Sequence, residues 1–151
     1  MKAALVKIDV AAADLGKSVA QVFELVDGGT THEAGIVWVF NLANDLNARR
    51  RDLRFWRPEL FARVQGQADK FNAHELDNII PLVLTENRLS FQAGEVDQLF
   101  QIRPHTRRDY GNELPGNLDK GAHVYSRTAL SNFLKRRWLS PNGQTGKALA
   151  A

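Results

Sequence analysis

The sequence lacks cysteine and long apolar runs. None of its 151 residues is cysteine, which excludes a disulfide framework, a cysteine-based zinc site and thiol redox chemistry. No stretch of about eighteen apolar residues occurs, so the sequence predicts no membrane-spanning helix and no membrane partner. The N-terminal segment carries Lys7 and Asp9 among its apolar residues, which makes it a poor secretory signal. These absences fit a reducing compartment, and we expect a cytoplasmic protein.

Recognisable catalytic and metal-binding motifs are also missing. The histidines are scattered along the chain rather than set at metal-ligand spacing, at His32, His74, His105 and His123. The sequence contains no phosphate-binding loop, no Gly-x-Ser-x-Gly elbow and no HExxH motif. We therefore expect a protein without catalytic activity, metal or cofactor.

The chain does contain enough apolar residues for a packed core, and its positive charge is unevenly spread. Hydrophobic residues make up 44% and charged residues 25%, which argues against wholesale disorder. Residues 1–75 hold ten basic and ten acidic side chains, whereas residues 76–151 hold ten and seven and so carry the whole net charge of +3. Within the neutral half, one short window opposed only by Asp52 holds Arg49, Arg50, Arg51, Arg54 and Arg57. Such local crowding is what phosphate binding requires.

The most informative pattern lies in residues 89–139. A short helix opening at Ala93 is followed by a sharp turn, and Pro104 then begins a second, basic helix. Proline suits this position because its missing N–H would be unpaired in the first helical turn anyway. Residues 111–121 are rich in glycine, asparagine and aspartate, as a tight hairpin requires, and Ser126 caps a final helix. A small domain that presents one helix to the DNA major groove has this order of elements.

The residues that match a known pattern are 94–96, Leu99, 102–106, 113–116 and 124–134. On these residues the stretch resembles the small winged helix-turn-helix domains of the excisionase and MerR-like group. The resemblance implies DNA binding in a bacterial or mobile-element setting, with the helix after Pro104 as the recognition helix. That group usually has valine at the position of Arg107, which would direct this side chain inward.

A weaker second copy of the pattern occupies residues 9–66. Residues 10–25 line up with residues 95–110 at an offset of 85, and residues 54–60 line up with residues 124–130 at an offset of 70. The smaller second offset predicts a wing that is longer by about fifteen residues in the first copy.

The sequence provides that longer wing as two apolar segments. Residues 35–42 are rich in β-branched and aromatic side chains and predict a strand, and residues 50–56 predict the returning strand. Before them, Ser18 and Gln21 have the spacing of a capping box that opens a helix. Val22 in this helix stands where the second copy has Arg107.

These patterns predict an α+β fold, mainly helical, made of two tandem winged helix-turn-helix units. We expect residues 1–70 to form a unit with a long β wing and residues 71–88 to form a helical connector. Residues 89–139 would form the second unit, and residues 140–151 a flexible tail.

Candidate DNA-binding residues follow from the positions of the two recognition helices. In the second unit they are Arg103, His105, Thr106, Arg107 and Arg108. Arginine pairs with guanine O6 and N7, and one such pair discriminates between bases by about 1–3 kcal/mol. The alternative is a solvated helix face, with Arg108 paired to Asp109 or Glu113. In the first unit the candidates are Lys17, Ser18 and Gln21, although Glu24 on the same helix would repel phosphate, and this unit could instead dimerise or dock a partner.

The wings supply further candidates for phosphate contact. They are Arg49, Arg50, Arg51 and Arg54 on the long wing, with Lys120, His123 and Arg127 at the short one. On the long wing the alternative is an edge strand guarded by charge. The aromatic side chains of the long wing could stack on single-stranded bases, but their strand positions favour the core of the sheet; they are Trp38, Phe40, Phe55 and Trp56.

The function that these features predict is sequence-specific binding of double-stranded DNA without catalysis, as a transcription regulator or a recombination or excision accessory factor. The alternative is a protein-interaction adaptor, or a phage or plasmid structural-maintenance protein, whose winged helices bind protein. The protein could also act as a homodimer.

Overall fold

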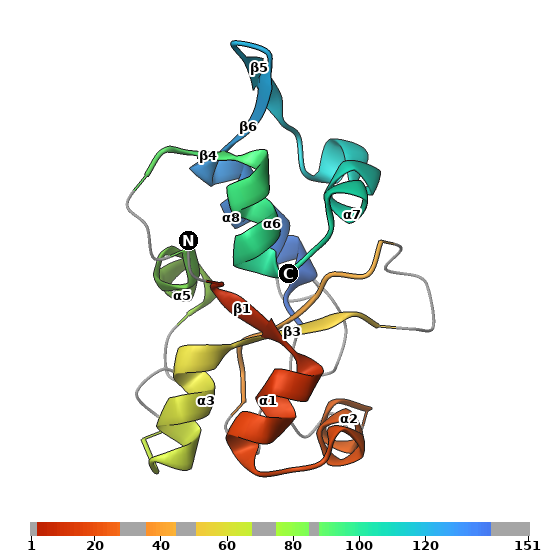
Figure 1. Ribbon diagram of the computed structural model, residues 1–151. Coiled ribbons are helices and arrows are strands. Elements are labelled where there is room, and N and C mark those ends of the chain that lie inside the picture. The colour runs from red at the N-terminus through yellow and green to blue at the C-terminus, as the bar shows by residue number, and fades with distance from the viewer. Residues whose placement is uncertain (1–2, 28–35, 45–50, 68–74, 85–87, 140–151) are drawn as a thin grey trace.

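The computed structural model describes residues 3–27, 36–44, 51–67, 75–84 and 88–139. In this part of the chain, α-helices combine with two three-stranded antiparallel sheets (Figure 1). The α+β fold class predicted from the sequence is therefore confirmed. The predicted tail of residues 140–151 lies outside the described residues.

The described residues of the first half form one sheet with three helices. Its elements are β1 (Leu5–Lys7), α1 (Ile8–Leu15), α2 (Val19–Asp27), β2 (Val39–Asn41), β3 (Leu53–Trp56) and α3 (Arg57–Val64). The strand order in the sheet is β1-β3-β2. The observed strands β2 and β3 are shorter than the predicted ones, and the residues that would form the tip of the long wing, 45–50, lie outside the described part.

The second half repeats this order of elements. They are β4 (Ser90–Gln92), α6 (Ala93–Phe100), α7 (Pro104–Asp109), the short 3-10 helix η1 (Gly111–Glu113), β5 (Asn117–Asp119), β6 (Ala122–Ser126) and α8 (Arg127–Arg137). The strand order is β4-β6-β5. Helix α5 (Leu76–Leu84) connects the halves, and it continues past Pro81 rather than ending there.

The two halves correspond residue by residue at the offsets found in the sequence. Leu5 pairs with Trp56 in the first sheet, and Ser90 pairs with Ser126 in the second. Each first helix also ends on a left-handed residue, Gly16 with φ 66° and Gln101 with φ 53°. The offsets of 85 and 70 therefore relate equivalent positions of the backbone, although the side chains at these positions differ.

Local sequence signals account for the helix starts. The Ser18 N–H donates to Gln21 Oε1 at 2.9 Å and the Gln21 N–H donates to Ser18 Oγ at 3.1 Å, which is the predicted capping box. Ser126 Oγ accepts the N–H of Ala129 at 3.0 Å. Pro104 is the first residue of α7, as its missing N–H favours.

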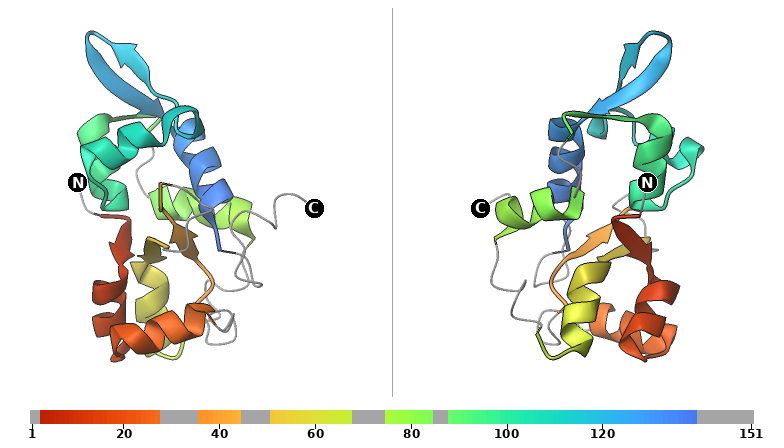
Figure 2. Two further views of the ribbon diagram at one scale, coloured as in Figure 1. Left: turned by 90° about the vertical axis from the view of Figure 1, so that its right-hand side faces the viewer. Right: turned by 60° about the vertical axis from the view of Figure 1, so that its left-hand side comes forward.

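The first sheet is buried on both faces. Val6, Leu53 and Phe55 face α1, α2 and α3, whereas Leu5 and Phe40 belong to a larger core with α5, α6 and α8. Figure 2 shows this sheet between the two groups of helices. Trp38, Phe40, Phe55 and Trp56 are all buried, so the core interpretation of the wing aromatics is confirmed and stacking on bases is excluded. One hydrophobic core therefore contains residues from both halves.

Polar contacts also join the halves. Arg54 of β3 donates to the carbonyl oxygens of Phe100 at 2.9 Å and Gln101 at 2.7 Å, at the end of α6. The Tyr110 hydroxyl, just after α7, donates to the carbonyl oxygen of Leu42 at 2.5 Å. The first half thus contacts the chain on both sides of α7 and fixes where this helix lies.

Glu59 is a buried carboxyl within the first half. It is 0% exposed and accepts the backbone N–H groups of Val37 and Trp38, each at 3.0 Å. Burial raises the pKa of Glu59 to about 7, while the two backbone donors act in the opposite direction. The side chain links α3 to the segment that leads into β2.

Candidate nucleic-acid interface

Helix α7 lies on the outside of the second half (Figure 1). It is reached from α6 by a turn in which the Ile102 N–H donates to the carbonyl oxygen of Asp97 at 3.0 Å. Arg103, His105 and Arg108 are exposed, and Thr106 is half-buried. The predicted acid partner Glu113 instead binds Arg137 of α8, at 2.6 Å. Three of the five candidate DNA-binding residues predicted for the second unit are therefore exposed to solvent.

Arg107 faces the interior. It is 6% exposed, and its Nε donates to Asp97 Oδ1 at 2.7 Å while its Nη1 donates to the Tyr125 hydroxyl at 2.9 Å. These bonds satisfy the guanidinium inside the domain, as a buried cation requires. The prediction that Arg107 reads bases is therefore wrong, and the inward direction implied by the family pattern is the one observed.

The short hairpin of β5 and β6 projects from the body of the molecule (Figure 2). Lys120 occupies a left-handed position at its tip, with φ 52°, and is exposed together with His123. Both side chains are open to solvent. Arg127 is half-buried at the base, where it donates to the carbonyl oxygen of Pro81 at 3.1 Å, so it joins the hairpin end of α8 to α5.

Ser18 and Gln21, at the start of α2, are exposed but already engaged. Ser18 and Gln21 cap the helix through each other's backbone N–H groups. Reading a base with either side chain would give up one of these bonds. Lys17 is exposed, and the same helix shows Val19 at 38% and Phe23 at 40% exposure. The outer face of α2 is therefore more apolar than that of α7.

Of the predicted long-wing arginines, the structure describes two, Arg51 and Arg54. Arg49 and Arg50 lie outside the described residues, and Arg51 is half-buried. Arg54 is only 2% exposed and is held by Asp52 at 2.5 Å as well as by the carbonyl oxygens at the end of α6. The prediction that Arg54 contacts phosphate is therefore wrong, because its guanidinium serves the junction between the halves.

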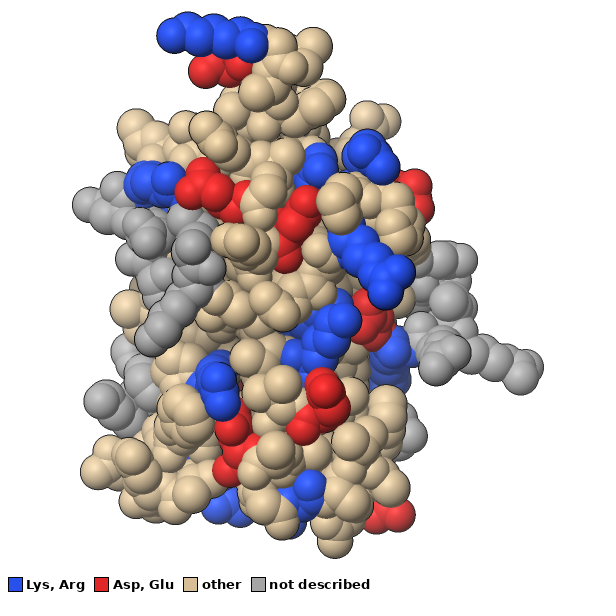
Figure 3. Space-filling model, viewed as in Figure 1, with Lys and Arg blue, Asp and Glu red and all other residues tan. Residues whose placement is uncertain are grey.

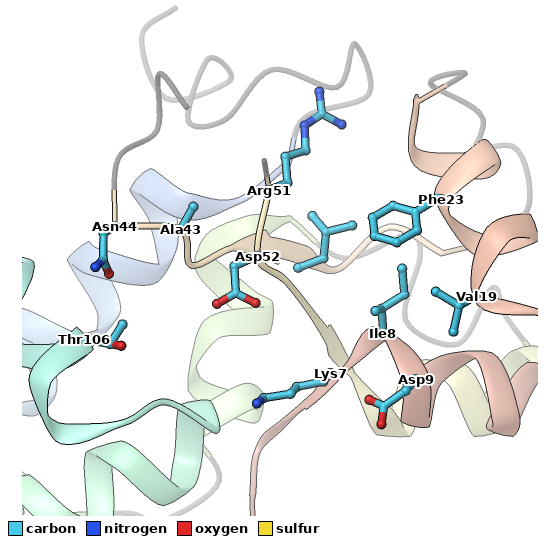
Figure 4. Close-up of a pocket in the computed structure, with 11 residues that line it drawn as sticks. Lys7, Ile8, Asp9, Val19, Phe23, Ala43, Asn44, Arg51, Asp52 and Thr106 are labelled. Atoms are coloured by element: carbon cyan, nitrogen blue, oxygen red, sulfur yellow. The ribbon is translucent and has the colours of Figure 1, made fainter. Parts of the chain in front are cut away.

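A groove runs along the junction of the halves. One of its cavities has a volume of about 800 Å³ and is lined by Lys7, Val19 and Phe23 from the first half and Thr106 from the second, with Asp52 between them (Figure 4). Lys7 also lines the two smaller cavities beside the turn before α7. No signal in the sequence assigns Lys7 to this place, because it is a lone lysine in a short apolar segment.

Charges of both signs are interspersed on the face shown in Figure 3. Several exposed or half-exposed cations of the protein are already paired, as in Arg57–Asp14 at 2.8 Å and Arg88–Glu95 at 2.5 Å. Such pairs contribute little attraction for a distant polyanion. The positive charge that could attract a polyanion is therefore that of cations without an acidic partner.

Within the described ranges, no group of three or more histidine or acidic side chains is placed to hold a metal ion. None of the helices in the same ranges is long and apolar enough to cross a membrane. Comparisons with protein-family models, with curated proteins and with solved structures found no match to this chain.

Proposed function

We propose that this protein binds double-stranded DNA in a sequence-specific manner, without catalysis, as a transcription regulator or an accessory factor in recombination. The observation that carries the proposal is the presentation of α7. His105 and Arg108 on the helix and Arg103 just before it are exposed to solvent, while Arg107 on the helix and Tyr110 just after it are bonded to the rest of the protein. A rigid helix with outward basic side chains is what base reading in a major groove requires.

We further propose that each half is a winged helix-turn-helix unit, residues 1–70 and 89–139, joined by residues 71–88. Helices α6 and α7 with the projecting hairpin supply the helix-turn-helix and the wing of the second unit. Lys120 at the hairpin tip supplies a phosphate contact, which orients the protein on the duplex but carries no sequence information.

The second half is the principal reader in this proposal. At the start of α2 the side chains of Ser18 and Gln21 form a capping box, and the helix exposes Val19 and Phe23, so α2 is less suited to base edges than α7. The shared core and the contacts of Arg54 and Tyr110 hold the two helices in one fixed arrangement. The chain would therefore meet DNA as one body and recognise an asymmetric site.

Selection of bound sequences from a random duplex pool tests the proposal directly. We expect enrichment of one short motif. Arg108→Ala should flatten the preference within that motif, because it removes a base-reading side chain. Lys120→Ala should weaken binding to every sequence alike. If the protein retards no duplex in a gel-mobility assay at low salt, the proposal is contradicted.

A second function is favoured by one observation. The exposed Val19 and Phe23 of α2 border the cavity of about 800 Å³, and such apolar side chains suit a protein partner or a second copy of the chain. An adaptor of this kind would bind its partner with weak salt dependence. Steep loss of duplex binding with rising salt favours the DNA-binding proposal instead.

A further inference from the structure

The end of the junction groove that lies beside the turn before α7 brings together cations from both halves. One cavity of about 300 Å³ is lined by Lys7 of β1 and by Gln98, Gln101, Ile102 and Arg103 around the turn before α7, with Asp97. The adjoining cavity of about 260 Å³ is again lined by Lys7 and Arg103, with His105 and Thr106 of α7. Lys7 and Arg103 are thus common to both cavities, and they come from different halves.

The acidic residues of this end are neutralised by buried arginines. Asp52 lies 2.5 Å from Arg54, and Asp97 lies 2.7 Å from Arg107. Among the residues that the structure describes, no carboxylate lies within ion-pair distance of Lys7. The same holds for Arg103 within those ranges. Their charges are therefore available to an anion.

We propose that Lys7 and Arg103 together hold one phosphate of the DNA backbone beside α7. An ammonium and a guanidinium on two sides of a groove complement a phosphate, since each donates charge-assisted hydrogen bonds to its oxygens. Figure 4 shows the Lys7 side chain extending toward the turn that leads into α7. The first half thus supplies a cation to the surface on which the second half reads bases.

This inference rests on the proposed function and changes the role of Arg103. Its guanidinium would position the protein on the backbone, while His105 and Arg108 read bases. Phosphate contacts act on all sequences alike. Loss of one contact removes about 0.9 from the slope of log affinity against log salt, which is a weakening of about fivefold at ~0.15 M salt.

The test measures binding of the full chain to a selected duplex and to a random duplex by fluorescence anisotropy over a salt series. We expect Lys7→Gln to lower affinity about fivefold on both duplexes and to reduce the slope by about 0.9. Lys7→Arg should retain both, because it keeps the charge. The matched control is Arg63→Ala on α3, an exposed arginine that lines none of the three cavities of the groove, which should leave affinity and slope unchanged.

Arg103→Ala should act like Lys7→Gln, and the two changes together should cost less than the sum of their separate effects, since both remove the same contact. Lys7 is exposed, so the melting temperature of Lys7→Gln should equal that of the native chain. Lys7→Met provides a second uncharged variant for the binding measurement. If the native chain binds duplex DNA and neither Lys7→Gln nor Lys7→Met lowers its affinity, the inference is overturned and the proposed function stands. An altered sequence preference in Arg103→Ala would also overturn it. Failure of the native chain to bind any duplex would instead reject the proposed function.

Discussion

Replacing Arg107 alone is expected to destabilise the protein strongly, whereas replacing Arg107 together with its two partners is expected to cost little. In the native protein Arg107 is held by Asp97 and Tyr125, and the side chains of the ion pair are only 7% and 11% exposed. Arg107→Val would leave a carboxylate and a hydroxyl in this interior without their donor. The cluster is therefore a sensitive point of the second half.

The first half contains the apolar version of the same cluster. At the offsets of 85 and 70, the positions of Asp97, Arg107 and Tyr125 correspond to Ala12, Val22 and Phe55. All three are buried in the core formed by α1, α2 and α3. The same backbone arrangement is thus compatible with either a polar or an apolar set of three side chains.

The expected magnitudes differ because a single change and a triple change leave different groups unpaired. Breaking a buried ion pair by removing one partner costs about 3–5 kcal/mol, whereas replacing the whole set with apolar residues is often neutral or stabilising. For a chain of this length, about 3–5 kcal/mol lowers the melting temperature by ~6–20 °C. The triple variant Asp97→Ala, Arg107→Val, Tyr125→Phe should recover most of that loss.

Urea unfolding followed by circular dichroism would measure both variants against the native chain. The reasoning is refuted if the triple variant is destabilised as much as Arg107→Val, because unpaired polar groups would then not be the cause. Since Arg107 does not face DNA in the proposed function, the triple variant should also retain the sequence preference of the native protein. A changed sequence preference would instead mean that Arg107 takes part in reading bases.

Three further predictions concern stability. The pKa of Glu59 is raised to about 7 from an ordinary value of 4.5, so the folded state binds its proton more tightly than the unfolded chain does. Ionisation of Glu59 should therefore lower the free energy of unfolding as pH rises from about 4.5 to 7, by up to about 3 kcal/mol. Thermal melts at pH 5 and pH 8 should show this dependence in the native chain but not in Glu59→Gln. Gly116→Ala would place its Cβ 2.9 Å from the Tyr125 ring and should lower stability by about 1–3 kcal/mol. The control Gly94→Ala, whose Cβ would meet nothing within 4 Å, should not lower stability. Equal melting temperatures for the two variants would contradict the expected clash. Ser126→Ala removes the cap of α8 and should cost about 1 kcal/mol in urea unfolding, whereas Ser126→Asp, which can still cap, should not.

The sequence was sufficient for features that depend on near neighbours. The cap at Ser126, the capping box of Ser18 and Gln21, and the start of α7 at Pro104 each involve residues within one helical turn. The two offsets between the halves were also readable, because a repeated unit repeats its apolar spacing and its turns. Exposure of Arg108 at the candidate surface agrees with this local pattern.

Only the tertiary structure decided which cations are accessible and that the two halves share a core. Arg54 looked like a wing arginine because its neighbours in sequence are basic, but its carbonyl partners are 46 and 47 residues away. Lys7 gained its place in the groove for the same reason, since the groove forms only when β1 lies beside the turn before α7. Burial and electrostatic environment are sums over residues that are close in space, so distant contacts determined them where local spacing could not.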